Sequence, residues 1–291
     1  MEKAFYEALQ SGNRQSFLLR EFDSSGFNAP YHFHPEFELT YIVQGSGKRY
    51  TGSYMDYFTD GDLVLLGSNL PHCWKLSDGD AQTSARSIVL QFNENFLGDT
   101  FFKKDEMQHI QMLLAKSDSG IAFTGNIVST IKTSLETTLK MESNFDRVIS
   151  FLQILQTLAL SDEYMLLDKH RSIATISATE QQRLYAVWSY IVENFRGDIS
   201  LAKAAAIANM TTNAFCKYFK KATRRTFIET VIDFRLTYAV QQLLQTYKPV
   251  SEIAFESGYN DVSQFHKNFK AKNKVSPLNY RKQFLKMAAK G

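Results

Sequence analysis

The chain has 291 residues, 44% of them hydrophobic and 22% charged, which is ordinary for a soluble globular protein and leaves no apolar stretch long enough to span a membrane. Two domains are expected at this length, and the lack of an apolar segment behind Met1, with only two cysteines, argues against export and favours a cytoplasmic protein. The formal net charge is only +3, so by itself it does not indicate a polyanionic partner.

The first hundred residues have the pattern of a β-domain. Short aromatic and β-branched runs at 39–43 and 63–66 are strand-like, and frequent glycines separate such runs: Gly45, Gly47, Gly52, Gly61 and Gly67. Short strands with turns between them are typical of a barrel or a sandwich. We therefore expect one of these over residues 1–104.

The pattern changes near Asp105. Apolar residues then recur at helical spacing, at Ile127, Ile131, Leu135, Leu139, Val148, Phe151, Leu152, Leu155, Leu158 and Ala159. These stripes predict helices within residues 105–169. Two interpretations stay open, since the stripes could pack against the β-domain or one of them could form a dimer interface. We expect a homodimer.

Residues 170–179 lack periodicity and are rich in Ser, Thr and Ala, which predicts a linker. Ser177 and Glu180 have the spacing of a capping box for the helix that follows. The remaining residues, 180–291, are predicted to be all-α, with Pro249 and Pro277 at helix starts or in loops.

Charge is divided unevenly between the two parts. Residues 1–170 contain 14 Lys and Arg against 22 Asp and Glu, a formal charge of −8, whereas residues 171–291 contain 19 against 8, a formal charge of +11. A basic C-terminal part is typical of a protein that binds a polyanion. Charge alone does not distinguish DNA from RNA or from an acidic protein.

The C-terminal part contains a degenerate repeat at an offset of 50 positions. The matched pairs are Ala204 with Ala254, Phe215 with Phe265, Lys217 with Lys267, Phe219 with Phe269, Lys220 with Lys270 and Thr226 with Ser276. In each copy a short Ala-containing helix leads through a turn to a cap residue, Thr211 or Asp261, and then to a helix with two Phe residues four positions apart. This spacing predicts two helix-turn-helix units.

Burial of the Phe pairs predicts which side chains of each second helix face outward. Short polar and basic groups on an exposed helix face suit the major groove of DNA. We expect base contacts from Asn213, Cys216 and Lys217 in the first unit and from Ser263, His266 and Lys267 in the second. We expect phosphate contacts from Lys220, Arg224, Arg225, Lys270 and Lys274.

These C-terminal residues resemble the AraC/XylS family of bacterial regulators over about 183–284. The second unit carries the strongest resemblance, in Ile253-Ala254, Ser257-Gly258-Tyr259, Phe265, Phe269-Lys270, Ser276-Pro277 and Tyr280-Arg281. It implies a transcription regulator with both recognition helices in successive major-groove segments of double-stranded DNA, and RNA polymerase as a candidate partner. Arg224 and Lys274 stand where the family commonly has glycine, which predicts a left-handed residue at the end of each recognition helix.

The N-terminal part resembles the cupin superfamily. Its first motif is matched in spacing by Gly26, His32, His34, Glu38 and Gly45, and its second in part by Gly61, Asp62, Pro71 and His72. The resemblance implies a jelly-roll barrel. Since His32, His34 and Glu38 have the same parity, extended strands would point them into one interior, where His72 could join them.

Two uses of these four side chains stay open. Three imidazoles and a carboxylate could hold a borderline divalent metal ion, or the same pocket could bind an organic, sugar-like effector without metal. Trp74 is expected in the core or the pocket wall, and Cys73 as a buried thiol.

The sequence thus predicts a ligand-responsive, sequence-specific DNA-binding transcription regulator that is not an enzyme. The alternative is a metal-dependent cupin enzyme, an isomerase or dioxygenase, with a basic accessory domain. An enzyme has no need of a second domain with a fifty-residue repeat, and no further acid–base pair or nucleophile constellation stands out.

Overall fold

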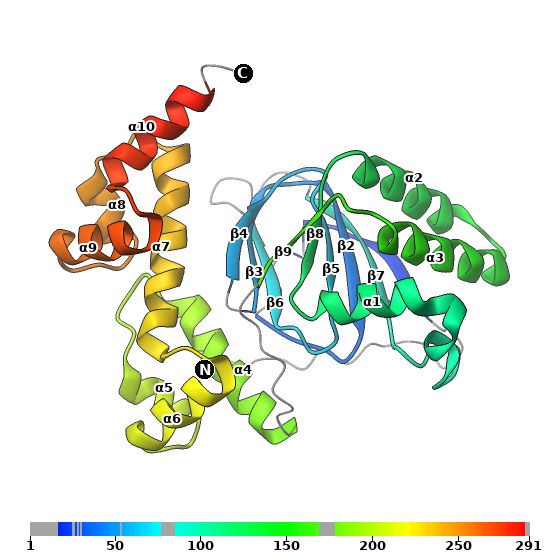
Figure 1. Cartoon of the computed structure of the whole chain (residues 1–291), viewed down its shortest axis with the longest axis horizontal. Helices are drawn as coiled ribbons and strands as arrows, with labels where there is room; N and C mark the ends of the chain where they lie inside the picture. Colours follow the sequence, from blue (N-terminus) through cyan, green and yellow to red (C-terminus); the bar gives the residue numbers. More distant parts are fainter. Residues whose placement is uncertain are drawn as a thin grey trace. The chain divides into compact units, whose positions relative to one another are not determined.

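The computed structural model describes residues 17–24, 27, 29, 31–52, 54–76, 85–168 and 178–288, and the chain divides into two compact units, Met1–Ile173 and Ala174–Gly291 (Figure 1). Most of the predicted linker, 170–177, lies outside the described residues, as does Ser177 of the predicted capping box. The first unit is rich in strands and the described part of the second is helical, which confirms the predicted organisation at this level.

Antiparallel strands of the first unit form two sheets, of order β1-β7-β2-β5-β8-β9 and β4-β3-β6. Their bounds are Phe17–Phe22 (β1), Phe37–Gln44 (β2), Gly47–Thr51 (β3), Tyr54–Phe58 (β4), Leu63–Leu66 (β5), His72–Leu76 (β6), Arg86–Phe92 (β7), Ile121–Phe123 (β8) and Tyr164–Leu166 (β9). The strands predicted at 39–43 and 63–66 are β2 and β5. The ladders of the described residues do not close the predicted barrel, because strand patterns specify faces but not whether two sheet edges meet.

Strand β2 shows how the larger sheet separates a dry face from a polar one. Its side chains alternate, so Leu39 and Tyr41 join the apolar core on one face while Glu38, Thr40 and Ile42 line a cavity on the other. Both faces are covered, which is why nearly the whole strand is buried. The neighbouring strand β7 follows the same alternation and places its own polar side chains beside those of β2.

Helices cover the dry face of the larger sheet (Figure 1). These are α1 (Gln108–Ser117), α2 (Asn126–Lys140) and α3 (Asn144–Ala159), preceded by short 3-10 turns at Phe101–Lys103 and Asp105–Met107. The predicted stripes, including Ile131, Leu135, Phe151 and Leu155, pack against the sheet. Residues 105–169 are not helical throughout, since β8 and β9 add two three-residue strands to the sheet.

The second unit contains two helix-turn-helix copies joined by a long helix. Its helices are α4 (Ala178–Asn194), α5 (Leu201–Ile207), α6 (Thr212–Thr223), α7 (Phe227–Gln245), α8 (Val250–Glu256), α9 (Val262–Asn273) and α10 (Pro277–Ala288). The bounds of α6 and α9 differ by the predicted 50 positions. Pro249 caps α8 and Pro277 begins α10, as predicted. No helix among the described residues is long and apolar enough to cross a membrane.

Candidate nucleic-acid interface and N-terminal polar cavity

Each recognition helix is anchored by its Phe pair. Phe215 and Phe219 of α6 and Phe265 and Phe269 of α9 are 0% exposed. Burying an aromatic ring four positions from another fixes the rotation of the helix about its own axis, because both rings must enter the core. The opposite face of each helix is thereby directed outward.

The predicted cap residues begin both recognition helices. The Thr211 side chain accepts a hydrogen bond from the Ala214 N–H at 3.4 Å, and Asp261 accepts one from the Ser263 N–H at 2.8 Å. Each side chain satisfies a backbone donor that the first turn of a helix leaves unpaired. The local sequence therefore fixes where each recognition helix starts.

The predicted DNA-facing residues are exposed and lie on the outward faces of α6 and α9. They are Asn213, Cys216, Lys217 and Lys220 in the first helix and Ser263, His266, Lys267 and Lys270 in the second. Gln264 of α9 is also exposed, and it donates from Nε2 to Asn268 Oδ1 at 3.2 Å.

Both recognition helices end in a left-handed residue that is not glycine. Arg224 has φ 59° and Lys274 has φ 65°, so the predicted backbone conformation is confirmed at both positions. The Lys274 ammonium turns back and donates to the Ala271 carbonyl at 3.0 Å. Arg225, also predicted to contact phosphate, forms an ion pair with Asp233 of α7. The phosphate roles stay predictions.

In each helix-turn-helix unit an arginine side chain donates a hydrogen bond to a backbone carbonyl of a preceding segment. Arg235 of α7 donates from Nε to the Phe195 carbonyl at 2.6 Å, just after α4. Arg281 of α10 donates from Nε to the Leu243 carbonyl at 3.0 Å, in the last turn of α7. The helix that follows each recognition helix thus holds the end of the helix that precedes the unit, so the repeat extends beyond the fifty-residue offset pairs.

In the N-terminal unit the four predicted pocket residues come together. His32, His34, Glu38 and His72 form what we call the His/Glu cluster, in which one nitrogen from each imidazole lies within 4.8 Å of the others. These side chains do not meet by pointing to the same face of one strand, because only Glu38 lies on β2. A backbone bridge holds His32 to His72, with hydrogen bonds of 3.0 and 2.9 Å. Gly26 of the predicted motif lies outside the described residues.

The Glu38 carboxylate is the centre of this cluster. Its Oε2 accepts from Gln91 Nε2 at 2.7 Å and lies 3.1 Å from His34 Nε2, while Oε1 accepts from the Thr40 hydroxyl at 2.7 Å. Burial alone would raise the pKa of Glu38, but the His72 and His34 imidazoles outweigh it and hold the pKa well below its ordinary value. The cluster therefore keeps a buried carboxylate ionised.

Two of the imidazoles present Nε2 to this carboxylate. His72 Nδ1 lies 2.7 Å from the Leu70 carbonyl and His34 Nδ1 lies 3.2 Å from the Glu36 carbonyl, so each Nδ1–H donates to a backbone oxygen. The two Nε2 atoms lie 3.7 and 3.1 Å from Glu38 Oε2. Gln91 Nε2 also lies 3.3 Å from His34 Nε2, so an amide and a carboxylate share this part of the cluster, and a cation bound among these atoms would pair with the Glu38 carboxylate.

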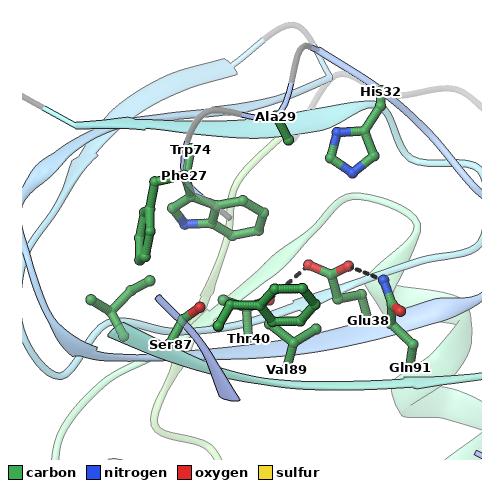
Figure 2. A pocket seen from close by; sticks show the side chains of 11 residues that line it. Phe27, Ala29, His32, Glu38, Thr40, Trp74, Ser87, Val89 and Gln91 are labelled. Carbon is green, nitrogen blue, oxygen red and sulfur yellow. Dashed lines mark hydrogen bonds between the residues drawn. The ribbon is translucent and has the colours of Figure 1, made fainter. Parts of the chain in front are cut away.

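A cavity of about 290 Å³ opens beside the cluster. Figure 2 shows Glu38 and Gln91 on one side of it and Phe27 and Trp74 on the other. The full lining is Phe22, Phe27, Ala29, His32, Glu38, Thr40, Ile42, Trp74, Ser87, Val89 and Gln91. Trp74 Nε1 and Gln91 Oε1 are buried and have no hydrogen-bond partner among the described residues.

Sequence reasoning found His32, Glu38 and the pocket wall at Trp74, but it missed the polar contribution of β7. Gln91 stands opposite Glu38 in the β2–β7 ladder, and Ser87 stands opposite Ile42. The usable signal was the alternation of polar and apolar residues along 86–92. Which strand would lie beside β2 could not be read from it.

Comparison with known proteins identifies the C-terminal part. A family profile described as "Helix-turn-helix domain" matches residues 204–283. Relatives span most of the chain: an uncharacterized HTH-type transcriptional regulator, YdeC, of Bacillus subtilis is 20% identical over 87% of this chain and 86% of its own length. The lactose operon transcription activator of Staphylococcus xylosus is 28% identical over 84% of each chain. The HTH-type transcriptional activator RhaS of Mannheimia succiniciproducens is 24% identical over 87% of this chain and 89% of its own length.

These relatives are transcription regulators rather than enzymes, which decides against the alternative of a cupin enzyme with a basic accessory domain. Their similarity extends over both units and not only over the helix-turn-helix part. With two capped recognition helices, buried Phe pairs and a basic outward face, the C-terminal unit is an AraC-type helix-turn-helix domain, and the chain is a DNA-binding transcription regulator.

Proposed function

We propose that this regulator responds to a small molecule that binds in the cavity beside the His/Glu cluster. The observation that carries the proposal is a pair of buried polar atoms, Trp74 Nε1 and Gln91 Oε1, that no described residue satisfies. Buried polar groups are nearly always paired, so a donor and an acceptor left over in one cavity indicate a ligand. The volume of about 290 Å³ lies at the small end of ligand pockets.

The chemistry of the lining favours a sugar-like effector. Aromatic rings of Phe27 and Trp74 offer an apolar surface for the face of a pyranose ring, and the side chains opposite them offer hydrogen bonds from Thr40, Ser87 and Gln91. Two antiparallel sheets around a polar cavity support the proposal that this unit is a cupin-like jelly roll used as a sensor.

We also propose that the His/Glu cluster binds a divalent metal ion. The residues fit such an ion, because the Nδ1–H groups of His34 and His72 are held by carbonyl oxygens, an arrangement that orients metal-ligating imidazoles. His72 Nε2 is buried and has no hydrogen-bond partner within the part of the chain that the structure describes. Imidazole nitrogens with one carboxylate suit zinc, nickel, iron or manganese. A bound ion would polarise an effector oxygen, while Gln91 and Thr40 hold Glu38 in place.

For the DNA-binding unit we propose base contacts from the outward faces of α6 and α9, namely Asn213, Cys216, Lys217, Ser263, His266 and Lys267. Phosphate contacts are proposed for Lys220, Arg224, Arg225, Lys270 and Lys274. Support comes from the exposure of these side chains, of which only Arg225 is partly buried, and from the basic last turns of both helices. Because a regulator works where its DNA is, we propose a cytoplasmic location.

We propose that the regulator is a homodimer. On α3 and its end, Phe145, Ile149 and Leu160 are exposed by 72%, 41% and 59% and share one helix face, since their spacings are 4 and 11 residues. An exposed apolar stripe of this kind supports a protein interface. RNA polymerase remains a candidate partner on the strength of the family resemblance alone.

Thermal melting of the full chain tests the sensor proposal, with zinc, nickel and manganese salts and a panel of mono- and disaccharides as probes. A ligand at 100 times its Kd stabilises the folded state by about 2.7 kcal/mol and raises the melting temperature. His32→Ala combined with His34→Ala should abolish the rise. The exposed His109 of α1 supplies the matched control, since His109→Ala should leave it intact.

The same double variant should still bind duplex DNA selected from a random pool by the wild-type chain. Loss of the ligand response with retained DNA binding supports a sensor role. A folded double variant that responds like the wild type would show that the histidines are only structural, and no response of the wild type to any probe would leave these ligand classes without support.

A further inference from the structure

One carboxylate joins the two recognition helices. Asp233 of α7 forms an ion pair with the guanidinium of Arg225 through Oδ2, and a second ion pair with the ammonium of Lys272 through Oδ1, at 2.8 Å. Its side chain is only 17% exposed, compared with 28% for Arg225 and 40% for Lys272. Because the carboxylate is partly buried, water and salt screen these ion pairs less than they would screen exposed pairs. We call these three residues the Asp233 clasp.

The two cations belong to the ends of different recognition helices. Arg225 directly follows the left-handed end of α6, and its N–H lies 3.3 Å from Thr223 Oγ1, which also donates to the Arg225 carbonyl at 2.9 Å. Lys272 lies in the last turn of α9. The capping box of Thr226 and Glu229 fixes the start of α7 just after Arg225. Asp233 is therefore linked to the end of α6 through Arg225 and to α9 through Lys272.

The clasp is not a feature of the repeat. An offset of 50 positions places Val275 opposite Arg225 and Ala222 opposite Lys272, and neither can form an ion pair through its side chain. Features shared by both units, such as the Phe pairs and the caps, build each unit separately. A contact that occurs once, between the units, acts on their relation to each other.

We propose that Asp233 is a positioning residue that fixes the separation and relative orientation of α6 and α9, and so sets which spacing of two DNA segments the regulator accepts. Two helices that enter successive major-groove segments must match the helical repeat of DNA, about 34–36 Å per turn. The apolar core of α7, α8 and α9 limits how far the second unit can move, and the clasp selects one arrangement within that limit.

A spin-label distance measurement tests the proposal without DNA. Cys216 is exposed on α6, and His266→Cys places a second thiol at the equivalent position of α9, while Cys73 is buried. A Cys216→Ser chain without the second thiol controls for labelling of Cys73. We expect one narrow distance distribution in the chain with both thiols, and a broader or shifted one after Asp233→Asn, which removes the charge and keeps the size.

Lys272→Met should have the same effect, and adding it to Asp233→Asn should change little more, because both remove the same contact. The matched control is Glu256→Gln, which breaks an ion pair with Lys248 around α8 and does not reach α6. Circular dichroism melting identifies any variant that fails to fold. Because the Lys272 side chain is 40% exposed, we expect Lys272→Met to fold.

DNA binding gives the second readout. Duplexes are selected from a random pool with the wild-type chain, and footprinting locates the two DNA segments that the chain protects. One base pair is then inserted between these two segments. We expect the ratio of affinities for the original and the lengthened duplex to fall about fivefold in Asp233→Asn. Distance distributions and spacing ratios equal to those of the wild type would overturn the proposal. So would a uniform gain of affinity for all duplexes, which would mean that Asp233 only repels phosphate.

Discussion

His72 Nε2 lies 3.7 Å from Glu38 Oε2, although the two residues belong to different sheets. A backbone bridge between His32 and His72 holds the start of β6 against the segment that precedes β2. A buried carboxylate and an imidazole from opposite sheets thus form one site. We therefore expect the charge state of Glu38 to affect the stability of the N-terminal unit.

Glu38→Gln should destabilise the metal-free protein by about 1.5–3 kcal/mol at pH 7, because hydrogen bonds to an ionised group are lost. Since the pKa of Glu38 is lowered in the folded state, its contribution is fully present above the unfolded value of about 4.3 and is lost as the pH falls through the folded value. The difference between wild type and variant should therefore shrink below about pH 4.

Urea unfolding with chelator present measures this, in a Trp188→Phe background so that Trp74 reports on the first unit. Glu142→Gln, which alters an exposed carboxylate between α2 and α3, is the control and should have little effect. A difference that stays constant from pH 7 to pH 3 would show that Glu38 is not held ionised by its neighbours.

Lys267→Ala should weaken binding to the selected duplex by about 1–3 kcal/mol and binding to random DNA much less, because a base contact carries sequence information. Lys267 is exposed on the outward face of α9. Gel-shift titration on both duplexes measures the two losses. Lys282→Ala, on the exposed side of α10, serves as the control for a generic loss of positive charge. Equal losses on both duplexes would leave Lys267 as a phosphate contact.

Arg224→Gly should stabilise the C-terminal unit by about 1 kcal/mol, since glycine adopts the left-handed conformation without strain. If Arg224 contacts phosphate, the slope of log affinity against log salt should also decrease by about 0.9. Lys274→Gly is the informative comparison, because it loses the hydrogen bond to Ala271 and should gain less stability. An unchanged salt slope would refute the phosphate role of Arg224.

Gly258→Ala should destabilise the C-terminal unit by about 2–3 kcal/mol. Gly258 has φ 90°, and an added Cβ would lie 2.7 Å from the Phe195 carbonyl oxygen and 2.9 Å from that of Arg196, both of them backbone atoms. Gly197→Ala is the matched control, since its nearest contact would be 3.8 Å away. Thermal melting of both variants measures this loss of stability. Equal melting temperatures would mean that the turn at Gly258 can move to accommodate the added Cβ.

The sequence by itself determined the recognition helices and their ends. Phe residues four positions apart and a cap four residues before the first of them are local features, because they act within one or two helical turns. Their recurrence at an offset of 50 identified α6 and α9 with the observed bounds. The left-handed ends at Arg224 and Lys274 were implied by the family resemblance. Likewise, the histidine spacing identified three ring groups and a carboxylate that lie together.

Only the tertiary structure decided which distant residues complete these sites. Gln91 reaches Glu38 because β7 pairs with β2, and β8 and β9 exist because the sheet offers an edge to segments too short to show any period. Asp233 meets Lys272 only after α9 packs near α7. Such contacts depend on strand pairing and helix packing between segments far apart in the chain, and no local pattern encodes the choice of partner.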